Sequence, residues 1–470
     1  MRSLLWFLLV FSAAPALSAQ RPAITAGLRP FVSVDASVVV LTHVRLLDGT
    51  GAPPRDDQTI VLNDGMIAAV GPAGSLTPPA GATVLDLRGH TVTPGFVGLH
   101  EHTYFHQTTR TTQMTVSGPM AYLASGVTTI RTAGSMFPYQ ELNMQRAVAR
   151  GDLPGPRMHI TGPYLNGAAG PESMSRGVGS PAEARRVVAY WAEEGATWLK
   201  LQGSLTRAVA GAIIDEAHRH GLRVTGHLCS LSFADAAALG IDALEHGFIT
   251  NSAYVPGKQP DVCPAANMRA QADVDESSPA VQASIRELVE RKVALTSTLA
   301  VYETFMPGRA RLNPRAMELL APDTRQEVEA THANLAKDGF VVPDRLFRSM
   351  MAWDRDFVRA GGLLGAGVDP WGTGMLPGFG DLRNYELLAE AGFAPAEAIR
   401  IMSLNGATIL HEDARRGSVV PGKAADLVVI RGDPATNLAD IYQVVTVFRD
   451  GVGYDSAKML TAIRGKIGLQ

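Results

Sequence analysis

The sequence predicts an α/β protein: a (β/α)8 barrel, or TIM barrel, with a small β-sandwich domain formed from both ends of the chain. Three observations predict this fold. The 470 residues suffice for a barrel and a smaller partner domain. Short strands crowd both ends of the chain, whereas the middle alternates short apolar strands with amphipathic helices. No Gly-rich phosphate loop follows these strands, which disfavours the alternative of a doubly wound open sheet.

Residues 1–19 have the layout of a secretory signal peptide. An arginine stands near the start, an apolar run follows from Leu4 to Phe11, and small residues come next. The run is shorter than the roughly 20 residues that a membrane-spanning helix needs, and no lipid-accepting cysteine follows it. We therefore expect an exported protein, periplasmic or secreted, that is cleaved after Ser18 or Ala19.

The composition is that of a globular protein, with 46% hydrophobic and 19% charged residues and a net charge of −3. No block of Lys and Arg appears, so we expect a small-molecule partner and neither nucleic acid nor a membrane surface. The sequence leaves open whether the chain forms a homo-oligomer. It also leaves open whether its two cysteines, Cys229 and Cys263, form a single bridge.

The β-sandwich domain is expected from residues 33–93 and 413–458. In both segments, runs rich in β-branched residues are separated by Asp-Gly and Pro-Gly turns. Examples are SVVVLTHVRLLDG near the start and YQVVTVFRDGVGYD near the end. Because the residues between these two segments lack this pattern, we predict one sheet domain built from both termini.

The catalytic barrel is expected from residues 94–412. One of its helices is well marked, because Ser180, Pro181 and Glu183 give a capping-box pattern with proline in the first turn. Eight candidate strands follow one another in the sequence: FVGLHEH, VTTIRTAG, RMHITGP, TWLKLQG, LRVTGHL, ALEHGF, VALTSTL and LLGAGVD.

Side chains able to bind metals stand at the ends of these strands. His100 and His102 end the first strand, and residues two apart on a strand point the same way. Neutral imidazoles so placed suit zinc. His227 ends the fifth strand, His246 the sixth and Asp369 the eighth. Each alone is more often a hydrogen-bonded core group. The strand ends of a barrel meet at one face, however, so their shared position predicts one metal centre.

Lys200 ends the fourth strand, in WLKL, and is the sixth member of this set. Facing inward, it would place a cation in a dry barrel, which is costly. Burial lowers the pKa of an amine, and a neutral amine can take up carbon dioxide to form a carbamate. That anion has two oxygens able to bridge two metals. The alternative is that Lys200 pairs with a carboxylate or extends its ammonium to water.

Several segments resemble a known family. TPGFVGLHEH resembles the PG-[LF]-[IV]-D-x-HxH opening of the amidohydrolase superfamily. GAGVDP, EAGFAPAEAIRIMSLNGA and GSVVPGKAADLVVIRGDP are similar to its imidazolonepropionase-like branch of metal-dependent dipeptidases, carboxypeptidases and ochratoxinase-type amidases. The resemblance covers about residues 35–455. It implies two divalent metal ions, expected to be zinc. His100, His102 and Asp369 would hold the first, His227 and His246 the second, and a carboxylated Lys200 would bridge both.

The chain departs from the family pattern at three places. Gly98 stands where the family usually has an aspartate beside the first metal. The loop after the third strand lacks the Gly-Gly-His segment of many relatives. After the eighth strand, LPGFGDLRNYELL replaces a usual His-Gly.

The expected reaction is hydrolysis of an amide bond, in a peptide-like or N-acyl amino acid substrate, by a hydroxide that bridges the metals. Asp369 would take the proton of the water and pass it to the leaving nitrogen. Tyr164, Tyr302 or His159 would stabilise the oxyanion. Arg383 is a candidate grip for a substrate carboxylate, the alternative being a surface ion pair with a neighbouring acidic residue.

Three other functions compete with this one. Lactam, lactone or phosphoester hydrolysis at the same metals is compatible with the sequence. A mononuclear deaminase on this fold normally carries a His-x-x-Glu pattern at the fifth strand, and HLCS after the glycine of that strand lacks it. A non-catalytic scaffold is disfavoured because the ligand set is complete.

Overall fold

The computed structural model describes residues 21–167, 175–264, 270–309, 312–338 and 341–469. The predicted signal peptide, residues 1–19, lies outside these ranges. No helix among the described residues is long and apolar enough to cross a membrane.

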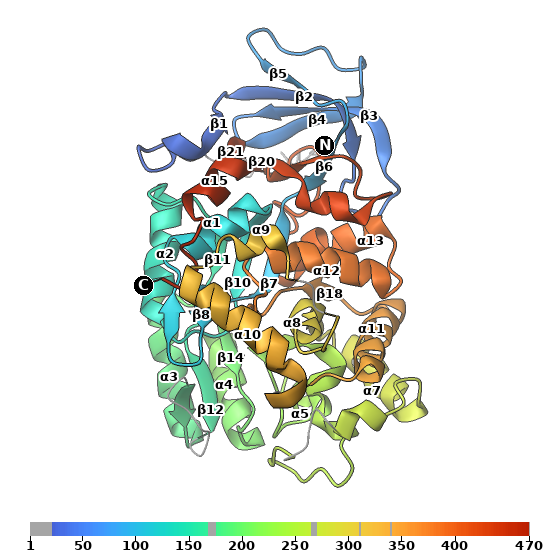
Figure 1. Ribbon diagram of the computed structural model, residues 1–470. Coiled ribbons are helices and arrows are strands. Elements are labelled where there is room, and N and C mark those ends of the chain that lie inside the picture. The colour runs from blue at the N-terminus through green and yellow to red at the C-terminus, as the bar shows by residue number, and fades with distance from the viewer. Residues whose placement is uncertain (1–20, 168–174, 265–269, 310–311, 339–340, 470) are drawn as a thin grey trace, which may run out of the picture.

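A sheet domain draws its strands from both ends of the chain, as predicted, and Figure 1 shows these two parts side by side. Its nine strands are joined in one hydrogen-bonded sheet, and the sandwich arrangement stays a prediction. Alternate residues, such as Val39, Leu41 and Leu427, pack into a core of its own. Its strands are β1 (Val32–Val34), β2 (Val38–Leu46), β3 (Arg55–Asn63), β4 (Met66–Pro72), β5 (Thr83–Asp86), β6 (His90–Pro94), β19 (Leu427–Arg431), β20 (Val444–Arg449) and β21 (Val452–Asp455).

All eight predicted strands of the middle segment are present, and they lie parallel to their neighbours. They are β7 (Phe96–Glu101), β10 (Val127–Thr132), β11 (Arg157–His159), β14 (Trp198–Leu201), β15 (Arg223–Gly226), β16 (Ala243–Glu245), β17 (Ala294–Ser297) and β18 (Leu364–Ala366). One sheet has the order β11-β10-β7-β18-β17-β16, and β14 and β15 belong to a second sheet.

Main-chain hydrogen bonds join these two sheets at both edges. The amide of Trp198 in β14 donates to the carbonyl of Ile160, just after β11, at 3.2 Å. The amide of Asp242, just before β16, donates to the carbonyl of Val224 in β15, also at 3.2 Å. The parallel strands therefore bring their carboxyl ends to one side of the molecule, where the candidate ligands stand.

Helices cover the outside of these strands (Figure 1). Helix α3 begins where the sequence predicts, because the side chain of Ser180 accepts the amide of Glu183 at 3.3 Å. The helices are α1 (Ser117–Ala124), α2 (Pro138–Arg150), α3 (Pro181–Glu194), α4 (Arg207–Arg219), α5 (Phe233–Ala238), α7 (Pro279–Glu290), α8 (Leu299–Glu303), α9 (Pro314–Met317), α10 (Pro322–Asp338), α11 (Asp344–Arg359), α12 (Phe379–Glu390), α13 (Pro395–Arg400), α14 (Gly406–Ile409) and α15 (Ser456–Ala462).

Three features lie beyond the sequence prediction. A hairpin of β8 (Tyr104–His106) and β9 (Thr111–Gln113) follows β7. Strands β12 (Tyr164–Gly167) and β13 (Ser175–Val178) extend the second sheet beside β14. Cys229 and Cys263, whose pairing the sequence left open, form a disulfide with Cα atoms 4.8 Å apart, which ties the loop after β15 to the long connection before α7.

Candidate metal centre

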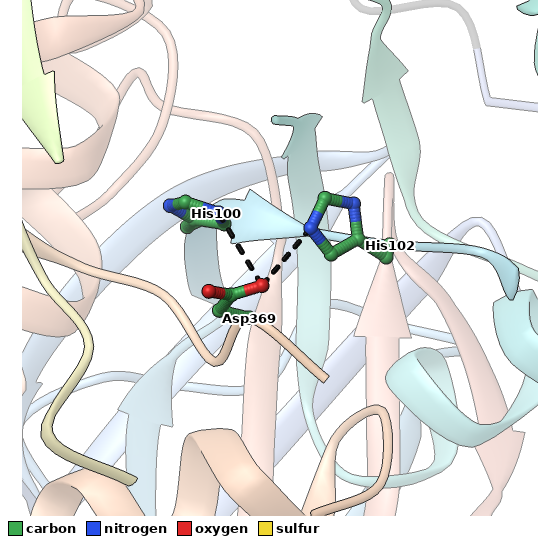
Figure 2. A group of neighbouring side chains, drawn as sticks. All are labelled: His100, His102 and Asp369. Atoms are coloured by element: carbon green, nitrogen blue, oxygen red, sulfur yellow. Dashed lines mark hydrogen bonds and ion pairs between the residues drawn. The ribbon is translucent and has the colours of Figure 1, made fainter. Parts of the chain in front are cut away.

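Three of the predicted ligands converge from two adjacent strands. His100 lies in β7 and His102 directly after it, while Asp369 follows β18, which pairs with β7. One carboxylate oxygen of Asp369, Oδ1, lies 3.0 Å from Nε2 of His102 and 3.5 Å from Nε2 of His100 (Figure 2). One ligand atom from each of the three residues can be chosen so that all lie within 4.8 Å of one another. This spacing leaves room for a single ion between them.

The other two histidines extend this cluster. The ring of His246 lies 4.6 Å from the ring of His100 and 4.6 Å from that of His227, measured between centroids. Its Nε2 is 3.9 Å from Oδ2 of Asp369. The structure thus brings together all four imidazoles and the carboxylate that the sequence singled out.

Two of these candidate ligands have strained backbone conformations. Asp369 has φ 53° and His246 has φ 68°, in the left-handed region that side chains other than glycine rarely adopt. Such strain costs about 1–3 kcal/mol and persists only where the surroundings hold it. The side chains of these two residues approach to 3.9 Å.

Lys200 lies within the same buried group of charges. Only 1% of its surface is exposed, and its Nζ has no hydrogen-bond partner among the described residues. Burial lowers the pKa of Lys200 to about 8, although Glu245 and Asp369 act in the opposite direction. The expected alternative, a direct pairing with a carboxylate, is absent within the described chain. Burial therefore raises the neutral fraction of this amine near neutral pH above that of an exposed lysine.

Burial also favours the neutral form of His100 and His227. Burial and the nearby Lys200 lower the pKa of His100 and of His227 to about 4. Burial of Asp369 opposes its ionisation, but His100 and His102 hold its pKa well below the usual range. Neutral imidazoles and an ionised carboxylate are the forms that bind a metal ion.

Sequence reasoning missed the residues that orient these ligands. Glu245, the residue before His246, accepts a hydrogen bond from Nδ1 of His100 at 2.8 Å. Arg131 of β10 donates to its other oxygen at 2.5 Å, and Thr225 of β15 donates to that oxygen too. Although burial opposes it, Arg131 holds the pKa of Glu245 well below its usual range. The sequence does carry one signal that could have identified them. Arg131 and Glu245 are charged residues of opposite sign, and each stands within an otherwise apolar strand.

A family model settles the classification. The model of the amidohydrolase family matches residues 91–453. The chain belongs to the amidohydrolase family. Over 84 residues, 18% of the chain, this amidohydrolase is 37% identical to the enamidase of Eubacterium barkeri, and the match spans only 22% of that enzyme.

Solved structures share its fold. The crystal structure of a Xaa-Pro dipeptidase with methionine bound in its active site is similar, with a TM-score of 0.64 and 18% identity over 89% of this chain and 100% of that one. Ochratoxinase of A. niger has a TM-score of 0.63 and 16% identity over 89% of this chain and 96% of that one. At these identities the comparisons establish the fold of the amidohydrolase alone.

Two of the predicted substrate-contact residues reach the centre of this amidohydrolase. The hydroxyl of Tyr164 lies 3.3 Å from Nε2 of His102 and also contacts the hydroxyl of Tyr104, from the unpredicted hairpin. The ring of Tyr302 meets that of His246 edge-on at 5.5 Å. The hydroxyl of Tyr164 and the ring of Tyr302 therefore each lie beside a candidate ligand.

The other two do not join the centre. His159 pairs with Glu412 at 3.2 Å. Arg383 directs two nitrogens at the two oxygens of the buried Glu303, at 2.7 and 2.8 Å, and a third nitrogen at Glu386. The fork that was expected to grip a substrate carboxylate is thus already bound to two carboxylates of the chain itself.

Proposed function

We propose that this amidohydrolase cleaves an amide bond, in a peptide-like or N-acyl amino acid substrate, at a centre of two divalent metal ions, with zinc as the expected ion. The convergence of neutral imidazoles, an ionised carboxylate and a buried amine at one end of parallel strands carries the proposal. The dipeptidase and the ochratoxinase with the same fold agree with an amide substrate.

The donor set fits such ions. His246 Nε2 and Lys200 Nζ are buried without a hydrogen-bond partner in the described chain, so each is a ligand atom in need of a cation or a modification. We assign the first ion to His100, His102 and Asp369 and the second to His227 and His246. Bound there, the ions would supply Lewis acidity and lower the pKa of a water molecule.

Lys200 would join the two sites as a carbamate. Its neutral Nζ forms a bond to the carbon of carbon dioxide and loses a proton, which leaves an anion with two oxygens. Burial disfavours the competing ammonium form, and that effect supports this assignment.

The chain's own groups would handle the protons and the substrate carbonyl. Asp369, ionised and within reach of both histidines of the first site, is placed to accept a proton and return it to the leaving nitrogen. The hydroxyls of Tyr164 and Tyr302 would donate hydrogen bonds to the developing oxyanion. Both tyrosines stay protonated, because burial raises their pKa values well above the usual range.

Two further assignments belong to this proposal. The eight parallel strands would close into a (β/α)8 barrel, which the hydrogen bonds at both edges of the two sheets support. Export to the periplasm or the medium is supported by the disulfide between Cys229 and Cys263, since such bonds persist in oxidising compartments.

Metal analysis combined with a substrate screen tests the function. Purified protein is dialysed against zinc, its metal content per chain is measured, and the loaded protein is offered dipeptides, N-acyl amino acids, lactams and lactones. We expect two ions per chain and turnover of an open-chain amide. One ion with release of ammonia would indicate a deaminase, and no ion a scaffold. Turnover of cyclic substrates alone would replace the amide assignment.

A further inference from the structure

Two positions of the metal-binding segment, Gly98 and Glu101, must be considered together. Gly98 stands where the motif has an aspartate, and Glu101 stands between the two histidines, where it is fully buried. A buried carboxylate is costly unless it is hydrogen-bonded. The burial of Glu101 therefore has to be explained by the groups that surround its side chain in the fold.

The side chain of Glu101 occupies the space that a side chain at position 98 would take. A Cβ atom built on Gly98 would lie 2.4 Å from Oε1 of Glu101 and 2.8 Å from its Cδ. Real side chains do not approach so closely. Any residue other than glycine at position 98 would displace Glu101.

A β-bulge brings the two residues to the same side of the strand. Gly98 pairs with Ile130, and Glu101 pairs with Thr132. The two pairs are three residues apart in β7 but only two residues apart in β10, so β7 contains one extra residue. A bulge interrupts the alternation of side chains. Without it, residues three apart would point to opposite faces.

Glu101 contacts the backbone that carries a metal ligand. Its Oε1 accepts the amide of Val368 at 3.2 Å, and Val368 immediately precedes the strained Asp369. The same amide and the amide of Asp369 also donate to the carbonyl of His100, at 3.2 and 2.8 Å. Glu101 thus completes a set of bonds that ties the end of β18 to the end of β7.

We propose that Glu101 is a positioning residue of the first metal site, and that it replaces an acidic side chain at position 98 by one supplied three residues later across the bulge. It acts through Val368 on the backbone of Asp369, and Gly98 is required because it leaves room for Glu101. This inference rests on the proposed function in one respect, namely that Asp369 is a ligand of a divalent cation.

The inference is tested through zinc affinity, measured by competition with a chelator, and through the melting temperature of the metal-free protein. Glu101→Gln keeps an acceptor oxygen and should hold zinc within a few-fold of the wild type. Glu101→Leu has a similar volume but no acceptor, and should weaken the first site roughly 10–100-fold, as loss of groups that orient ligands does. Glu287→Leu, which removes a glutamate of α7 remote from the centre, is the control and should change neither readout.

The proposed exchange of positions is tested by returning the acidic side chain from position 101 to position 98. Gly98→Asp alone should lower both the melting temperature and the zinc affinity, because its side chain collides with Glu101. Adding Glu101→Ala should recover both, so that the double variant binds zinc more tightly than either single variant. Equal affinities of the Gln and Leu variants, or a double variant no better than Glu101→Ala, would overturn the inference. A wild-type protein that binds no zinc would instead refute the proposed function, while the melting temperatures would still test the proposed exchange of positions.

Discussion

Nδ1 of His100 lies 2.8 Å from Oε2 of Glu245, a residue 145 positions later in the chain. The bond fixes the ring so that Nε2 of His100 faces Asp369. Because Glu245 also binds Arg131, three strands contribute to the orientation of one imidazole. The carboxylate of Glu245 is fully buried, as is the guanidinium that it neutralises.

Glu245→Gln should therefore harm both the fold and the metal site. It leaves Arg131 buried without its countercharge, and breaking such a pair costs about 3–5 kcal/mol. We expect a lower melting temperature and a zinc affinity reduced roughly 10–100-fold. Glu287→Gln, which breaks an exposed ion pair with Arg291 in α7, is a suitable control and should change stability by less than about 1 kcal/mol. An unchanged zinc affinity in Glu245→Gln would separate this residue from the metal site.

Removal of single ligands should abolish turnover while the protein stays folded. His100→Ala, His227→Ala and Asp369→Asn should each lower kcat/KM by several orders of magnitude, since each removes a donor from the converging group. His220→Ala, at the exposed end of α4, serves as the control and should retain full activity. Circular dichroism checks the fold. Near-normal turnover of any ligand variant would remove that residue from the centre.

Lys200 should carry the added mass of one carbon dioxide. The buried amine has no hydrogen-bond partner within the described chain. A carbamate formed on Nζ would have oxygens that could bind the metal ions. A crystal structure should show density beyond Nζ, and Lys200→Ala should lose metal and activity. Short-chain carboxylic acids should restore part of the activity by filling the gap, whereas Lys466→Ala on the surface should behave as the wild type. An unmodified ammonium in a metal-loaded, active crystal would refute the carbamate.

The local chemistry of strand ends made the ligands predictable from sequence, because each lies at the end of a recognisable apolar run. The orienting residues were not predictable in the same way. Within ALEHGF, nothing distinguishes Glu245 from any other charged residue. Its role follows only from the fold, which places it in contact with His100 and Arg131. The role of Arg383 was open for a related reason: its partner Glu303 lies 80 residues away, and no local pattern links the two. The disulfide likewise depended on a distance that only the folded chain defines.

A variant of Arg383 distinguishes two roles for this side chain, binding of a substrate carboxylate or a structural ion pair. Arg383→Met would raise KM strongly for carboxylate-bearing substrates alone if the side chain gripped them. Its three bonds to Glu303 and Glu386 favour the other result, an equal loss on free and amide-capped substrates together with a lower melting temperature. Glu303 would keep only Arg309 as a cationic partner among the described residues. Paired KM measurements on both substrate types decide between the two roles, and Arg325→Met in α10 provides an exposed control.

Glu141 should make the protein less stable as the pH rises. Its side chain is fully buried in α2 and receives a hydrogen bond from Thr103 at 3.0 Å. Burial raises the pKa of Glu141 to about 8, from an ordinary value of 4.5, although hydrogen bonds from Thr103, Thr132 and Ser135 oppose the shift. Between these two pH values the folded state binds a proton that the unfolded state has lost. The free energy of unfolding therefore falls as the pH rises from about 4.5 to about 8, and the loss is complete above that range.

Glu141→Gln isolates this contribution, because the amide resembles the protonated carboxyl and does not titrate. Buried Asp354, whose pKa burial raises to about 7, adds a slope of the same sign, so the comparison must be between variant and wild type at each pH. We expect similar melting temperatures near pH 5, where the carboxyl is protonated in the fold, and a variant that becomes progressively more stable than the wild type towards pH 9. The exposed Glu329→Gln in α10 should show no such divergence. Parallel curves for Glu141→Gln and the wild type would mean that Glu141 is ionised in the folded protein at every pH tested.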